Sequence, residues 1–98
     1  MREASWDEWL DVLDDVLESD GNTSGTACPR CGAARLRIAY VGDVDEWIAS
    51  TSFWCESCLT GISLSTGRPP AGAEIIPGDR PHAELLALVP DFHIIWPA

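Results

Sequence analysis

Two Cys-x-x-Cys pairs constrain the fold of this chain more than any other feature of its 98 residues. The first pair is Cys28 and Cys31, the second is Cys55 and Cys58, and the sequence has no other cysteine. A two-residue spacer lets the backbone curl so that both thiolates of a pair reach one tetrahedral ion at about 2.3 Å. The spacing therefore predicts that the four thiolates bind a single structural Zn²⁺ ion.

Other chemistries explain the cysteine pairs less well. A redox-active Cys-x-x-Cys needs a βαβ context, whereas each pair here lies between predicted strands. A catalytic zinc ion keeps one open position, which four cysteines close. The tripeptide His82-Ala83-Glu84 matches part of a deaminase signature, but it follows both pairs at a distance in the sequence. We therefore expect no catalytic residue and no enzyme activity, and an iron site of the rubredoxin type stays open as the alternative metal centre.

Alternating side chains predict strands around the cysteine pairs. Residues 34–41 alternate, residues 47–54 are rich in β-formers, and residues 62–65 alternate again. Residues 42–45 (GDVD) are turn formers. The stretch between the two cysteine pairs is therefore long enough for a two-stranded hairpin, and the predicted sheet has three antiparallel strands.

This order of motifs resembles the zinc-ribbon family. The sequence CPRCG is followed by the predicted hairpin, by CESC and by a third strand, over about residues 26–66. The resemblance implies a three-stranded antiparallel sheet on a four-cysteine zinc site, with Cys28, Cys31, Cys55 and Cys58 as the ligands. It implies no particular activity. The segments AYVGD, FWCESCLTGI and PDF are similar to those of small uncharacterised bacterial zinc-ribbon proteins.

The residues before the first cysteine pair predict an amphipathic helix over residues 5–19. Ser5 and Glu8 form a capping box, and Gly21 stands where a C′ glycine would end the helix. At 100° per residue the apolar and acidic side chains separate onto opposite faces. The apolar face holds Trp6, Trp9, Leu10, Val12, Leu13, Val16 and Leu17, and the acidic face holds Asp7, Glu8, Asp11, Asp14, Asp15 and Glu18.

The last thirty residues predict an extension without long regular elements. Prolines and glycines fill residues 67–81, with Glu74-Ile75-Ile76 as a possible short strand. Residues 82–89 predict a short helix with Pro81 at N1 and Asp79 near the N-cap, and residues 92–96 predict a final strand. We expect a helix and linker (1–25), a ribbon (26–68) and an extension (69–98) that pack as one small, β-rich α+β domain.

The net charge of −10 is concentrated in the predicted helix. The first twenty residues hold eight acids and one arginine, whereas residues 21–68 hold four of each, and the chain has no lysine. Because affinity for nucleic acids comes from cations that neutralise phosphates, nucleic acid is a disfavoured partner. The N-terminus lacks the pattern of a signal peptide, and no apolar run reaches the roughly 20 residues of a membrane span. We therefore expect a cytoplasmic protein. The absence of lysine alongside abundant alanine, glycine, arginine and aspartate suggests a bacterial gene of high GC content.

These features favour a protein-binding adaptor that presents the acidic helix and an aromatic surface to a more basic partner. Tryptophans and Phe53 on the predicted hairpin supply aromatic side chains to both sheet faces, so a homodimer is also open. The alternative is a transcription or replication ribbon that touches nucleic acid through Arg30, Arg35 and Arg37. A further alternative is a nucleic-acid mimic, in which the acidic helix imitates phosphates and blocks a DNA-binding protein.

Overall fold

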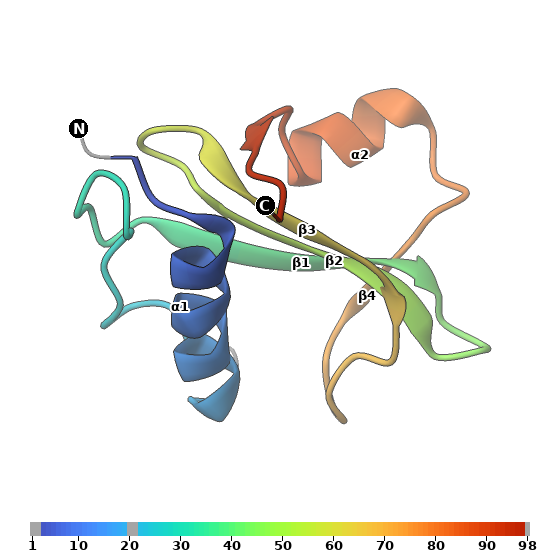
Figure 1. Cartoon of the computed structure of the whole chain (residues 1–98). Coiled ribbons are helices and arrows are strands. Elements are labelled where there is room, and N and C mark those ends of the chain that lie inside the picture. The colour runs from blue at the N-terminus through green and yellow to red at the C-terminus, as the bar shows by residue number, and fades with distance from the viewer. Residues whose placement is uncertain (1–2, 20–21, 98) are drawn as a thin grey trace.

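A five-stranded mixed sheet forms the centre of the fold in the computed structural model, which describes residues 3–19 and 22–97 (Figure 1). The strands are β1 (Leu36–Asp43), β2 (Ile48–Cys55), β3 (Thr60–Gly67), β4 (Ile75–Pro77) and β5 (His93–Ile94). They lie side by side in the order β4-β1-β2-β3-β5. With two helices, the chain is a small β-rich α+β structure.

The C-terminal segment makes the sheet wider than the three antiparallel strands expected from the sequence. Strand β2 pairs antiparallel with β1 on one side and with β3 on the other. Strand β4 then adds to β1 in parallel, and β5 adds to β3 in parallel. Long connections allow these parallel pairings, because a strand that returns in the same direction needs a crossover.

Helix α1 (Trp6–Glu18) begins where the capping signal predicts. The Ser5 hydroxyl oxygen accepts a hydrogen bond from the backbone N–H of Glu8 at 3.2 Å, which satisfies one of the free donors of the first turn. Ser19 is the C-cap residue, and the predicted C′ residue Gly21 lies outside the described residues.

Helix α2 (His82–Leu88) is shorter and less firmly packed than α1. The prediction of Pro81 at N1 is wrong by one position, because Pro81 has φ −53° and ψ 142° and is itself the N-cap residue. No side chain caps this helix start, and none of the seven helical residues is buried. Neither described helix is both long and apolar enough to cross a membrane.

Consecutive aromatic residues of β2 point to opposite faces of the sheet. Phe53 lies on the face covered by α1, where Trp9 meets its ring edge-on with centroids 5.8 Å apart and planes at 83°. Trp54 lies on the other face and stacks on Phe92, with centroids 5.6 Å apart and planes at 14°. The C-terminal segment thus covers the aromatic side chain that the sequence left without a partner.

The main hydrophobic core lies between α1 and the sheet and extends to the cysteines. It contains Trp9, Leu13 and Val16 from α1, Leu36, Phe53 and Ile62 from the sheet, and Cys28 and Cys55. All of these side chains are at most 3% exposed. The cysteine cluster is therefore continuous with the hydrophobic core, so the positions of the cysteines depend on how the core is packed.

Candidate metal centre

The four cysteine sulfurs converge at one end of the sheet. Every pair of Sγ atoms lies within 4.8 Å. The Cys28–Cys58 sulfurs are 3.8 Å apart and the Cys31–Cys55 sulfurs are 3.6 Å apart. A tetrahedron with metal–sulfur distances of about 2.3 Å has sulfur–sulfur edges of about 3.8 Å. The spacing of the thiols therefore fits one tetrahedrally coordinated ion, and the residues predicted from the sequence are brought together.

Two matching turns, which we call the first and second knuckles (residues 28–32 and 55–59), hold the cysteines. In each turn the N–H of the fifth residue donates to the carbonyl of the first at 2.9 Å, Gly32 to Cys28 and Leu59 to Cys55. Both fifth residues have left-handed backbone, with φ of 79° at Gly32 and 49° at Leu59. A leucine therefore takes the position for which a glycine is the usual choice.

Gly61, which follows the second knuckle, stands where two strands approach closely. It lies in β3 opposite Trp54 of β2. A Cβ atom at Gly61 would lie 2.6 Å from Trp54 Cα, which is too close for any side chain. The glycine therefore allows β3 to approach the buried Trp54 and contributes nothing to the bend of the knuckle.

Backbone N–H groups point at the sulfur atoms. The N–H groups of Arg30 and Cys31 donate to Cys28 Sγ at 3.3 and 3.4 Å. In the second knuckle, N–H groups of Ser57 and Cys58 lower the pKa of Cys55 in the same way, although burial outweighs them. Such donors stabilise negative charge on sulfur, so the local backbone is arranged for thiolates.

Burial separates the thiols in acidity. Burial raises the pKa of Cys28 to about 12 and also raises the pKa of Cys55. The backbone N–H of Ala33, by contrast, lowers the pKa of Cys31 to about 7. A metal ion binds the thiolate form, so metal binding displaces the protons that the two buried thiols hold.

The sheet fixes the two knuckles relative to each other. Cys55 ends β2 and pairs with Leu36, the first residue of β1. The N–H of Glu56 donates to the carbonyl of Arg35 at 2.9 Å, just beyond that pair. The start of β1 and the end of β2 therefore bring the second knuckle beside the chain that leaves the first.

Of the three arginines considered for nucleic-acid contact, Arg37 is held by an acidic residue. Arg37 forms an ion pair with Glu56 of the second knuckle, and this pair lowers the pKa of the glutamate, with a smaller contribution from Arg35. Arg30 is half-buried in the first knuckle. The partner of Arg37 is therefore a residue of the second knuckle and not an acid of α1.

The two histidines lie outside the cysteine cluster, and most tryptophans are at least partly buried. His82 begins α2 and His93 lies in β5, and among the described residues the four cysteines are the only cluster that could hold a metal ion. The indole N–H of Trp47 donates to the Pro69 carbonyl at 3.0 Å. Trp96, by contrast, is 70% exposed. Trp96 is therefore the one tryptophan among the described residues that is exposed.

Comparison with known proteins finds no matching family model, no matching curated protein and no matching solved structure. The function must therefore be argued from the cysteine cluster and the surfaces around it.

Proposed function

We propose that this chain is a zinc-ribbon protein whose single Zn²⁺ ion is structural. The convergence of four thiols at tetrahedral spacing carries this proposal. Cys28, Cys31, Cys55 and Cys58 would hold the ion, and their four sulfurs would leave no position for a substrate. When bound, the ion supplies folding free energy, because the unfolded chain has no preformed site.

We further propose that the zinc-held scaffold acts as a protein-binding adaptor. Helix α1 packs on the sheet through its apolar face and leaves a row of acidic side chains in solvent. The exposed acids are Asp7, Asp11, Asp14, Asp15 and Glu18. Charges fixed on a packed helix steer a partner of opposite charge and speed its association. The partner is accordingly a protein with a basic surface.

The test compares the acidic face with acids elsewhere on the surface. One variant carries Asp7→Asn, Asp11→Asn and Asp14→Asn. A matched control carries Asp45→Asn, Glu46→Gln and Asp79→Asn, which removes the same charge at three other exposed positions. Both variants and the wild type are used, with zinc bound, to capture proteins from the host for identification.

The adaptor proposal predicts a partner with a basic surface that the wild type and the control retain and the helix variant loses. Capture that is equal for all three proteins would show that the acidic face does not bind. Capture of nothing by the wild type would contradict the adaptor role itself.

A further inference from the structure

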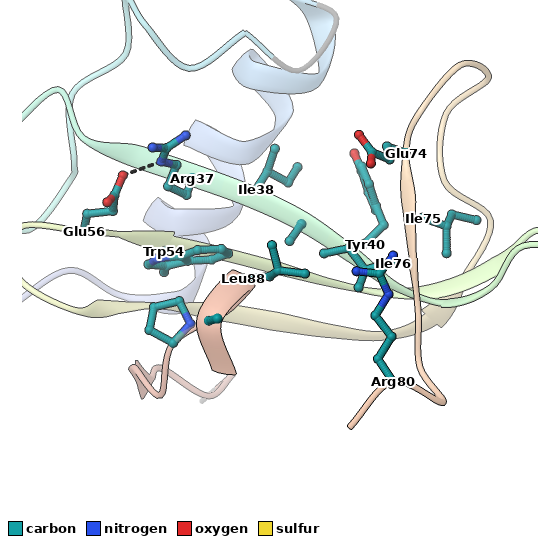
Figure 2. Close-up of a pocket in the computed structure, with 13 residues that line it drawn as sticks. Arg37, Ile38, Tyr40, Trp54, Glu56, Glu74, Ile75, Ile76, Arg80 and Leu88 are labelled. Carbon is teal, nitrogen blue, oxygen red and sulfur yellow. Dashed lines mark hydrogen bonds and ion pairs between the residues drawn. The ribbon is translucent and has the colours of Figure 1, made fainter. Parts of the chain in front are cut away.

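A groove lies along the outer edge of β1, beside α2. It has a volume of about 760 Å³ and is lined by Arg37 to Tyr40 of β1, by Glu74 to Ile76 at β4, and by Ala87 and Leu88 of α2 (Figure 2). Trp54 and Pro90 complete its apolar lining. We call this hollow the edge groove. It is distinct from the cysteine cluster and from the acidic face of α1.

The edge groove follows a part of β1 that has no neighbouring strand on one side. The Gly78 N–H donates to the Gly42 carbonyl at 3.0 Å, so the backbone groups of Gly42 face β4. Alternate residues of a strand face the same neighbour, so those of Ile38 and Leu36 face this side as well. Strand β4, however, pairs only with residues 40–42. Within the described residues, the backbone groups of Ile38 and Leu36 have no strand opposite them on this side.

The apolar side chains that line the groove differ in how much of their surface is exposed. Leu88 of α2 remains 45% exposed, although it lines the groove. Trp54, by contrast, is only 3% exposed and is already stacked on Phe92. Leu88 is therefore the exposed large apolar side chain of the groove that a ligand could cover.

The charges of the groove favour an acidic ligand. Arg37 is already paired with Glu56. Arg80 is exposed and has no ion-pair partner in residues 3–19 or 22–97. Glu74 lies at the part of the β1 edge that β4 already occupies. In Figure 2 the Arg80 side chain points back toward Tyr40, which makes Arg80 the unpaired cation among the described groove residues for a carboxylate of the ligand.

We propose that the edge groove binds an extended, acidic segment of a partner protein as an additional β-strand. Its backbone pairs with Leu36 and Ile38, an apolar side chain packs against Leu88, and a carboxylate pairs with Arg80. Main-chain hydrogen bonds supply affinity and the alternating side chains supply selectivity in this mode of recognition. The inference rests on the adaptor function proposed above and names a second surface and the chemistry of its ligand.

A partner segment fits this edge better than a second copy of the chain. Pairing of β1 with β1 of another copy would place two proteins of net charge −10 against each other. It would also leave Arg80 without the carboxylate that a partner segment provides. The free edge is only about three residues long, which suits a peptide and gives little area for a stable dimer.

The experiment uses a library of random octapeptides displayed on phage and selected on the full chain with zinc bound. We expect enriched peptides to alternate apolar and polar residues and to carry aspartate or glutamate. One such peptide is then synthesised and its affinity is measured for the wild type, for Arg80→Glu and for Arg68→Glu. Arg68 is also exposed and lies outside the groove, so it controls for the change in total charge.

The proposal predicts that Arg80→Glu weakens peptide binding at least tenfold, whereas Arg68→Glu changes it less than twofold. It also predicts that the peptide slows hydrogen exchange at the Ile38 amide, whereas the Ala39 amide, which faces β2, is unchanged. Absence of enrichment, binding without protection of Ile38, or equal loss in both variants would overturn it. A concentration-dependent dimer that protects Ile38 would overturn it too, since the occupant would then be a second copy.

These outcomes are independent of the test of the acidic face. One outcome is that the peptide fails to bind while the helix variant still loses a native partner that the wild type captures. That result would leave the adaptor function intact and would remove only the edge groove. Equal native capture by the wild type and the helix variant, together with successful peptide binding, would remove the acidic face as a docking surface and leave the edge groove.

Discussion

Leu59 occupies in the second knuckle the backbone conformation that Gly32 occupies in the first. Their φ angles are 49° and 79°, and each donates its N–H to the carbonyl of the first cysteine of its knuckle at 2.9 Å. A leucine in the left-handed region is strained by about 1–2 kcal/mol, because its Cβ approaches the backbone. The second knuckle thus keeps its shape at a cost that the first avoids.

Relief of this strain is the first prediction. Leu59→Gly should raise the free energy of unfolding by about 0.5–1 kcal/mol, because strain is removed while some backbone entropy is lost. The gain should be visible because the Leu59 side chain is 45% exposed and buries little surface. Gly32→Leu should lower stability by about 1–2 kcal/mol. Urea denaturation with excess zinc measures both, and destabilisation by Leu59→Gly would contradict the account.

Loss of the contact between α1 and the sheet should be costly. Trp9 and Phe53 are both fully buried and meet edge-to-face. We expect Trp9→Ala or Phe53→Ala to destabilise the chain by about 3–5 kcal/mol, through lost burial and the remaining cavity. Trp96→Ala is the matched control, because this tryptophan is 70% exposed, and should change stability by less than about 0.5 kcal/mol. Similar effects of all three substitutions would argue against this packing.

Metal affinity should depend on pH in a defined direction. Without metal, the pKa of Cys28 is raised to about 12 and that of Cys55 is also raised, so both thiols carry protons near neutral pH. Zinc must displace these protons, so its apparent affinity should rise by roughly tenfold or more per pH unit between about pH 5 and 8. Competition with a chromogenic chelator measures the slope, and calorimetry in buffers of different ionisation enthalpy counts the protons. An affinity that does not change with pH would contradict the thiolate site.

Nucleic acid should not bind with useful affinity. The Arg37 side chain is held by Glu56, and the chain has no lysine to add phosphate contacts. We expect no electrophoretic shift of DNA or RNA even at about 50 mM salt, where phosphate contacts are strongest. A shift that disappears as salt rises and that Arg35→Ala weakens would instead favour the nucleic-acid alternative.

The sequence predicts best what local signals determine. Ser5 caps α1, and the side-chain alternation predicts the three long strands to within a few residues. Adjacent aromatic residues on opposite faces follow from the period of a strand. The Cys-x-x-Cys spacing predicts the convergence of the thiols, because two knuckles on neighbouring strands have little freedom.

The remaining features depend on contacts between distant parts of the chain. Strands β4 and β5 have three and two residues, and their parallel pairing depends on where the proline-rich connection returns. The cover of Trp54 by Phe92 depends on the same path. The left-handed backbone of Leu59 has no signal of its own, because the sequence offers no glycine at that position. The edge groove exists because β4 pairs with only part of β1. The amino-acid composition does not determine where that pairing ends.

X-ray absorption spectroscopy at the zinc edge tests the central proposal most directly. On the full chain loaded with one equivalent of Zn²⁺, we expect four sulfur ligands at about 2.3 Å and no nitrogen or oxygen bound to the ion. Substitution of Cys58→Ser should replace one of the sulfurs with a shorter bond to a lighter atom. Fewer than four sulfurs in the wild type, or a water molecule bound to the ion, would contradict a closed structural site.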